Sequence, residues 1–359
     1  MKISQVHLRN FRNYHDEVIK FDDHLNIIIG DNAQGKTNIL EAIVLCSNCR
    51  SFKDVDDEAM IMHGEAFGDC EICFIDDKPL KVKVIISPKG KTLVANNNIV
   101  NKTSDFIGLL NVIIFEPSHI AFFDKAPSYR RKIIDMEISK VDKKYVYALN
   151  NYYKLLKERN AYLKTNDIDL NYLAVLEAKM IDYQQIIISK RKELVDIINK
   201  RLSKLYSKLN DQTLDLKLNY QCCIDEGDIK ENLINMYKQN HKKDLLFNVT
   251  NAGIHREDLV FRLNGHDISD VASQGQKRLA IIAFKLMLIN YIKYKTNKLP
   301  ILLLDDILSE LDEAKQALLL NTISSDIQTI ITTTMINSNL YEKSFKVIKI
   351  KNGKVGGNK

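Results

Sequence analysis

Residues 30–37, Gly30-Asp31-Asn32-Ala33-Gln34-Gly35-Lys36-Thr37, follow the apolar run LNIII and precede apolar residues at helical spacing. The pattern G-x-x-x-x-G-K-T is typical of a phosphate-binding loop between a strand and a helix. Glycine lets the backbone curl so that its N–H groups surround phosphates, and the dipole of the following helix favours negative charge. We therefore expect ATP contacts from Gly30, Asp31, Asn32, Ala33, Gln34, Gly35, Lys36, Thr37 and Asn38, with Lys36 on the β and γ phosphates and Thr37 on Mg²⁺.

A second segment, ILLLDDILSELD at residues 301–312, places two acids directly after an apolar strand. The carboxyl end of such a strand would lie at the sheet edge near the phosphate loop. We expect Asp305 to bind Mg²⁺ and Asp306 to orient or deprotonate the attacking water, with Asp306 and Lys36 as catalytic residues. The alternative is a buried strand whose acids cap a helix.

The stretch SQGQ, residues 273–276, precedes a strongly apolar helix about 30 residues before the paired acids. Alone, this stretch is typical of a helix cap. In this order along the chain it predicts a signature loop, in which Ser273, Gly275 and Gln276 meet the γ-phosphate held by a second subunit, and Ser273 is also a catalytic candidate. Arg12 is a further nucleotide contact, and Thr332, Thr333 and Thr334 are alternative γ-phosphate sensors; both assignments have structural alternatives.

Helical periodicity predicts the domain organisation. One long helix or two are expected over 129–163, and the second helix of an antiparallel arm carries apolar residues from Leu173 to Leu209. The predicted fold is α/β: an ATPase head in two parts, 1–126 and 211–359, around a helical arm lobe at 127–210. The final stretch, NGKVGGNK, is expected to lack regular structure.

Charge is concentrated in the arm. The 359-residue chain has a net charge of +6, whereas residues 129–209 hold 18 Lys and Arg against 10 Asp and Glu. This net +8 favours nucleic acid, although a solvated helical face would look the same. Arg130 and Arg131 are expected to contribute to the basic surface. No long apolar run indicates a signal peptide or a membrane helix, which predicts a cytoplasmic protein without membrane contact.

The cysteines allow two interpretations. Cys46, Cys49, Cys70 and Cys73 form two CxxC pairs, a spacing seen in zinc ribbons. Cys70 and Cys73 lie in a strand-like run, where residues three apart face opposite sides, and Gly-rich knuckles are missing. We expect reduced thiols rather than zinc ligands.

Four segments together resemble the RecF family over essentially the whole chain. They are LRNFRNY, GDNAQGKTNILEAI, PSHIAFFDKAPSYRRKIID and SQGQ with LLLDDILSELD. The resemblance implies an ABC/SMC-type ATPase head, an ATP-dependent homodimer, and binding to double-stranded DNA and single-strand gap junctions. It also implies slow DNA-stimulated ATP hydrolysis, and RecR with RecO as partners that load RecA.

This sequence departs from the family pattern at three positions. Ser118 stands where an acid usually follows the proline, Lys125 replaces a glycine, and Ile133 stands where an aromatic is common. A glutamine before the arm, expected in ABC-type ATPases, is not evident. The alternative function is a short SMC-like structural ATPase in another DNA-maintenance complex; a transporter subunit would need a membrane partner.

Overall fold

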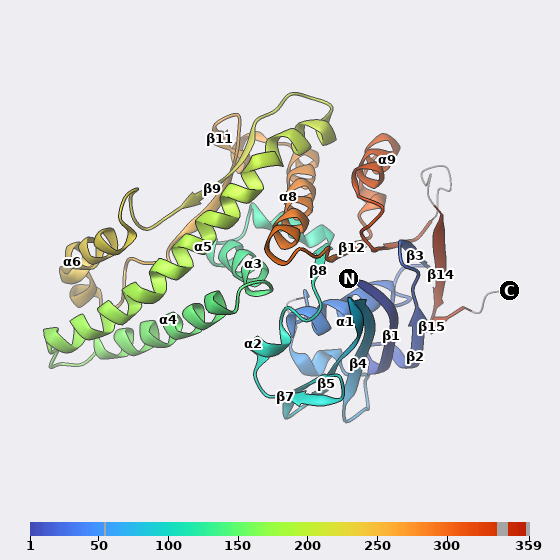
Figure 1. The fold of residues 1–359 in the computed structure, drawn as a ribbon, viewed down its shortest axis with the longest axis horizontal. Coiled ribbons are helices and arrows are strands. Elements are labelled where there is room, and N and C mark those ends of the chain that lie inside the picture. Colours follow the sequence, from blue (N-terminus) through green and yellow to red (C-terminus); the bar gives the residue numbers. More distant parts are fainter. Residues whose placement is uncertain (54, 336–343, 357–359) are drawn as a thin grey trace. The chain divides into compact units, whose positions relative to one another are not determined.

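The computed structural model describes residues 1–53, 55–335 and 344–356. They fall into two compact units (Figure 1). Unit 1 comprises residues 1–119 and 281–359, and unit 2 comprises residues 120–280. In the described part of the chain, no helix combines the length and hydrophobicity needed to cross a membrane.

A mixed sheet in unit 1 positions the phosphate loop. Its strands run in the order β15-β14-β3-β13-β12-β8, and the five from β14 to β8 are parallel. Parallel strands place their carboxyl ends at one edge, so the loops after β3, β12, β13 and β8 meet there. The bounds are β3 Leu25–Ile29, β8 Val112–Phe115, β12 Ile301–Asp305, β13 Thr329–Thr333, β14 Phe345–Lys351 and β15 Lys354–Val355.

Helix α1 (Lys36–Asn48) packs between this sheet and an antiparallel one. Its predicted apolar stripe, Ile39, Leu40, Ile43 and Val44, is buried, and most of its other side chains are buried too, since both sheets cover it. The antiparallel sheet has the order β2-β1-β4-β5-β6-β7. Its strands are β1 Lys2–Phe11, β2 Tyr14–Lys20, β4 Gly68–Asp76, β5 Lys78–Ser87, β6 Gly90–Ala95 and β7 Asn98–Val100; the short α2 (Thr103–Phe106) and α9 (Glu313–Thr322) also belong to unit 1.

The expected arm is present in unit 2. Helices α4 (Lys143–Tyr162) and α5 (Leu170–Asn210) lie side by side and are antiparallel (Figure 1). Asp142 and Asp169 begin them, each accepting a backbone N–H, which is a common N-cap. The α5 stripe is buried at Leu173, Leu176, Met180, Ile187, Leu194, Ile198, Leu202 and Leu209, and half-buried at Tyr183 and Leu205. Each fully buried side chain contributes about 1.5–3 kcal/mol, which explains why the arm forms.

Segment 211–280 packs with the arm in unit 2, whereas the sequence suggested that it belongs to the head. Strand β9 (Leu216–Gln221) contacts α5 and pairs with β10, and its Leu216 and Leu218 are buried. The division into 1–126, 127–210 and 211–359 therefore differs from the compact units. The other elements of unit 2 are α3 Pro127–Ser139, α6 Ile229–Phe247, β10 Asp258–Leu263, β11 His266–Asp267, α7 Ile268–Val271 and the start of α8 Gln274–Thr296.

The expectation for the final stretch was wrong over its described part, residues 352–356. Strands β14 and β15 pair as a hairpin with Lys351 opposite Lys354, so Asn352 and Gly353 form its two-residue turn. Both have positive φ, 50° and 69°. Asn-Gly is the strongest short-range signal for such a turn, and the high Gly content of the tail concealed it.

Candidate nucleotide site

The phosphate loop begins at the carboxyl end of β3 and ends at the N-terminus of α1. Ala33 and Gly35 have φ of 63° and 110°, which curls the backbone. The Lys36 ammonium donates to the carbonyls of Gly30 (2.6 Å) and Asp31 (2.8 Å). Burial lowers the pKa of Lys36, and Asp306, Asp305 and Asp31 oppose that shift. A buried cation inside a curl of backbone N–H groups is suited to binding phosphates.

Two segments remote in sequence brace this loop, and neither was predicted to do so. The Asn13 amide donates to the Gln34 carbonyl (3.0 Å), and the Tyr14 hydroxyl donates to the Gly35 carbonyl (3.1 Å). From the β14–β15 turn, the N–H of Gly353 also donates to the Gln34 carbonyl (3.1 Å). A Cβ at Gly35 would lie 2.7–2.8 Å from Asn13 and Tyr14, so the glycine is required by close approach as well as by its φ.

Asp305 links the phosphate loop to two neighbouring strands. Its Oδ1 accepts hydrogen bonds from the hydroxyls of Thr37 (2.9 Å) and Thr332 (2.7 Å). Burial raises the pKa of Asp305, and these two hydrogen bonds oppose the rise. A carboxylate beside a threonine hydroxyl offers the hard oxygen ligands that Mg²⁺ prefers, so the residues fit the predicted metal.

Asp306 occupies a different environment, although it is the next residue. Its φ is 48°, and its N–H donates to the carbonyl (3.2 Å) and hydroxyl (3.0 Å) of Thr332. Its Oδ1 is buried and has no hydrogen-bond partner among the described residues. Strained backbone and an unpaired buried acceptor are typical of functional positions. An acceptor in this state is suited to a water molecule or a metal-bound ligand.

The three candidate sensors differ in their contacts. The Thr332 hydroxyl is committed to Asp305, and the Thr333 hydroxyl donates to the Met335 carbonyl (2.9 Å). Thr334, half-buried, follows the end of β13. Which of the three senses γ-phosphate stays a prediction.

Glu116 is a site candidate that the sequence reasoning missed. It follows β8, whose Phe115 pairs with Leu304 in β12, so Glu116 lies beside Asp305 at the strand ends. Burial is the main cause that raises its pKa, and the charge of Asp305 adds to it. The Ser118 hydroxyl donates to Glu116 Oε1 (2.5 Å), so the departure at Ser118 is accompanied by an acid two residues earlier. The sequence did contain a signal for this residue, namely an acid that directly follows a short apolar strand.

Arg12 is bound to the protein itself. Its guanidinium donates to both oxygens of Glu41 in α1 (2.6 and 3.0 Å) and to the Ala59 carbonyl (2.6 Å). Glu41 is fully buried and also accepts from Ser51 and Lys53. A direct contact between Arg12 and nucleotide stays a prediction, and its observed role is to anchor the helix that follows the phosphate loop.

The predicted signature loop, residues 273–276, lies in unit 2 at the start of α8. The Ser273 hydroxyl accepts from the Gln276 N–H (3.2 Å), and the Gln276 amide oxygen accepts from the Ser273 N–H (2.9 Å). This reciprocal pair is a capping box, so the helix-cap alternative is correct as local geometry. Ser273 and Gly275 are nevertheless exposed, which leaves the helix N-terminus accessible to a partner.

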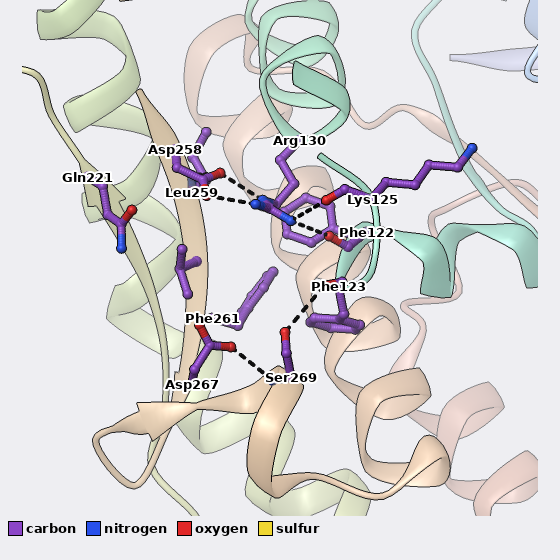
Figure 2. A pocket seen from close by; sticks show the side chains of 11 residues that line it. Phe122, Phe123, Lys125, Arg130, Gln221, Asp258, Leu259, Phe261, Asp267 and Ser269 are labelled. Carbon is purple, nitrogen blue, oxygen red and sulfur yellow. Dashed lines mark hydrogen bonds and ion pairs between the residues drawn. The ribbon is translucent and has the colours of Figure 1, made fainter. Parts of the chain in front are cut away.

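Of the two arginines expected on the basic surface, Arg130 is neutralised by an ion pair within unit 2, whereas the contribution of the half-buried Arg131 stays a prediction. Arg130 forms a two-pronged ion pair with Asp258 (2.7 Å for each bond) and also donates to the carbonyls of Phe122 and Lys125 (Figure 2). Arg131 donates to the Glu257 carbonyl. The Arg130–Asp258 pair lines a pocket of about 360 Å³ together with the rings of Phe122, Phe123 and Phe261 (Figure 2).

The other two departures lie in the same region. The Lys125 side chain is exposed and its ammonium lies 4.6 Å from the centre of the Tyr129 ring, so it adds positive charge where glycine is usual. Ile133 is half-buried in α3. Nothing in the described contacts gives either residue a functional role.

The cysteines of the two CxxC pairs are mostly buried. Cys46 donates to the Cys70 carbonyl (3.4 Å), and burial raises the pKa of Cys49 to about 12. Cys70 is buried and Cys73 half-buried, and they lie on opposite faces of β4, as the strand pattern predicts.

Comparison with known proteins decides the family. Over residues 2–357 the sequence matches the RecF/RecN/SMC N terminal domain family. It is 36% identical to the DNA replication and repair protein RecF of Streptococcus thermophilus, over 99% of this chain and 98% of that one. The corresponding protein of Clostridium novyi is 37% identical, with 99% of each chain covered. The chain belongs to the RecF family.

Solved structures agree with this assignment. Two structures of the recombination mediator protein RecF in the RecFOR pathway, with ATP and with ATPrS, give TM-scores of 0.90 and 0.89 at 30% identity. They cover 99% and 98% of this chain and 97% of their own. An Smc head bound to the C-winged helix domain of ScpA, at 17% identity, has a TM-score of 0.58 and shares the fold alone. The predicted α/β SMC-type head with an inserted helical arm is confirmed.

Proposed function

We propose that this chain is an ATP-dependent DNA-binding recombination mediator of the RecF type. One observation carries the proposal. Thr37, Asp305 and Thr332 are joined by hydrogen bonds beside Lys36, while a buried carboxylate oxygen of the neighbouring Asp306 has no hydrogen-bond partner within residues 1–53, 55–335 and 344–356. That arrangement is half of a nucleotide site. It would supply phosphate ligands, metal ligands and a general base, and it is formed without any group from residues 273–276 of the same chain.

ATP binding would join two protomers. The exposed Ser273 and the N-terminus of α8 supply hydrogen-bond donors and a positive dipole suited to a γ-phosphate held by the other protomer. Gly275 leaves this tip without a side chain, and Gln276 fixes the backbone through the capping box. The two nucleotides would thus lie between phosphate loop and signature loop at each end of the dimer interface.

Hydrolysis converts ATP and water to ADP and phosphate. Mg²⁺, held by Thr37 and Asp305, would neutralise charge on the β and γ oxygens. Asp306 would accept a proton from the attacking water, and Lys36 would stabilise the charge that develops on the transferred group. Loss of the shared γ-phosphate contacts would then separate the protomers.

DNA would be held through its phosphates rather than its bases. The exposed lysines of α4 and α5 support this, since lysine binds phosphate as a point charge. Double-stranded DNA next to a single-strand gap is the proposed substrate, with slow, DNA-stimulated ATP turnover. RecR together with RecO, acting upstream of RecA loading, are the proposed partners, consistent with the RecFOR pathway named for the related ATP-bound structures.

Sedimentation of the full chain with a non-hydrolysable ATP analogue tests the shared site. We expect wild type to dimerise. Lys36→Arg and Ser273→Arg should remain monomeric, because the first alters the phosphate loop and the second the signature loop that would enclose the nucleotide between two protomers. Matched exposed controls, Lys89→Arg and Ser325→Arg, should dimerise like wild type. Dimers of normal stability in both site variants would refute the mechanism.

The alternative function, a short SMC-like structural ATPase, requires a different structural feature. Such proteins need a long coiled coil, whereas α5 has 41 residues and α4 has 20. A helix of 41 residues spans about 60 Å, which is short for a tether. ATPase activity that gapped DNA leaves unchanged would favour this alternative over the mediator.

A further inference from the structure

Two adjacent cysteines and a buried glutamate converge at one end of the small sheet of unit 2. Cys222 and Cys223 follow β9, and Glu257 directly precedes β10, on the strand paired with β9. The two sulfur atoms and a carboxylate oxygen all lie within 4.8 Å of one another. Consecutive residues of a regular strand point to opposite faces, so the convergence depends on the bend that begins after Gln221.

Glu257 is the fixed member of this group. It is only 2% exposed, and its Oε2 accepts from the buried Arg191 (2.7 Å) and from the Tyr220 hydroxyl. Its Oε1 is turned to the cysteines, accepting from Cys222 Sγ (3.3 Å) and from the Cys223 N–H (3.1 Å). One carboxylate oxygen is therefore occupied by a permanent cation, while the other accepts only a weak thiol proton and one backbone N–H.

We propose that Cys222, Cys223 and Glu257 form a binding site for a thiophilic divalent cation, with Zn²⁺ as the physiological candidate. Thiolates and a carboxylate are ordinary zinc ligands. Metal–sulfur bonds of about 2.3 Å in a tetrahedron place two sulfur atoms about 3.8 Å apart, which is compatible with ligand atoms that all lie within 4.8 Å of one another. The cation would take the place of the thiol proton that now lies between Cys222 and Glu257.

The charges and atoms balance. One divalent cation displaces one proton from each thiol, forms two metal–sulfur bonds and one bond to Oε1, and releases both protons to solvent. Three protein ligands leave the fourth tetrahedral position to water. Arg191 continues to neutralise the second oxygen of Glu257, so the buried carboxylate is never left without a positive partner.

The site would join β9 to β10 beside the arm helix α5, through the Glu257–Arg191 pair. It lies wholly within unit 2 and contains none of the nucleotide ligands, so it is independent of the proposed ATP mechanism. A bound cation would stabilise unit 2 by favouring its folded form.

Titration of the reduced, metal-free full chain with Cd²⁺ tests the proposal through sulfur-to-cadmium absorption, with Zn²⁺ as competitor. We expect one Cd²⁺ per chain, bound at least about tenfold more weakly by Cys222→Ser and by Cys223→Ser, since loss even of outer-shell groups costs 10–100-fold. Cys73→Ser, which alters a half-buried thiol of unit 1, is the matched control and should bind like wild type. Equal binding by wild type and the Cys222→Ser/Cys223→Ser double variant would overturn the site.

A second measurement needs no substitution. Wild-type protein is treated with a maleimide with and without Cd²⁺, and the labelled peptides are identified by mass spectrometry. Protection of the peptide that contains Cys222 and Cys223, without protection of Cys73, is expected. Labelling of both adjacent cysteines at an unchanged rate would contradict the proposal even if the serine variants fail to fold.

Discussion

At the scale of single residues, two neighbouring aspartates occupy different environments because the backbone turns between them. Asp305 ends β12 in extended conformation and is bound to two threonine hydroxyls. Asp306 has positive φ, which turns its side chain out of the strand register, and one of its buried oxygens has no hydrogen-bond partner in the described part of the chain. The first environment suits a metal ligand, and the second suits a general base.

Replacing Asp306 tests this difference. Asp306→Asn should bind ATP like wild type but hydrolyse it about 10²–10⁴-fold more slowly, because the amide cannot accept the water proton. Nucleotide binding and single-turnover hydrolysis are measured separately. Asp56→Asn, the same change at an exposed position of unit 1, is the control. Hydrolysis at the wild-type rate would remove Asp306 from the mechanism.

The contacts of Glu41 predict how the stability of the protein depends on pH. Burial raises its pKa, but hydrogen bonds from Arg12 and Ser51 and the charge of Lys53 outweigh that effect, so the net pKa is lowered. Because the folded form holds this proton less tightly, the contribution to stability is complete above the unfolded pKa of about 4.3 and is lost as pH falls through the folded value.

Glu41→Gln should therefore lower the free energy of unfolding by about 1.5–3 kcal/mol at neutral pH and flatten its decline below about pH 4.3. Urea unfolding over a pH series, with hydrogen exchange in α1, measures both. The exposed Glu58→Gln should leave the pH profile of wild type unchanged. A variant whose stability declines as steeply as wild type in acid would show that Glu41 is not responsible.

At the scale of elements, sequence periodicity was informative wherever one pattern covers a whole strand or helix. The phosphate loop between β3 and α1, the apolar stripe of α5 and the run ending at Asp305 were all placed from sequence. The braces around the loop were not, because Asn13 and Gly353 are far from residues 30–37 in sequence and reach them only in the folded structure. The Arg130–Asp258 pair was missed for the same reason, since 128 residues separate its partners.

The arm is joined to the rest of unit 2 by a buried arginine of α5. Arg191 is 0% exposed and pairs with both Asp135 of α3 and Glu257 next to β10. Arg191→Met leaves two buried carboxylates without their cation, which should cost about 3–5 kcal/mol.

The expected effect is local to unit 2. Hydrogen exchange should accelerate in α3, α5 and β10, and thermal unfolding should begin earlier than in wild type. Lys200→Met removes an exposed cation from the same helix and serves as the control. Unchanged protection in all three elements would mean that the arginine bridge contributes little to the arm's attachment.

At the scale of the whole molecule, the charge that is exposed on the surface differs from the net charge of the sequence. Residues 129–209 carry a net +8, but Arg159 and Arg191 are fully buried and Arg130 is paired with Asp258. The cations that can meet DNA are therefore mainly lysines, among them Lys154 and Lys157, which are exposed on α4.

The dependence of DNA affinity on salt tests this distribution. Each phosphate contact contributes about 0.9 to the slope of log affinity against log salt concentration, so Lys154→Ala/Lys157→Ala should reduce the slope by about 2. Lys20→Ala/Lys89→Ala, two exposed lysines of unit 1, should retain the wild-type slope. An unchanged slope in the arm variant would exclude these lysines from the DNA surface.

The carboxyl-terminal hairpin has a practical consequence for anyone purifying this protein. Its Asn-Gly turn supports Gln34, so an affinity tag or fluorescent protein fused shortly after this turn would be tethered within a few residues of the phosphate loop. The rate of ATP hydrolysis measured on such a fusion would include any effect of the tag on the contact between the turn and Gln34. Kinetic work is better done after the appendage has been cleaved.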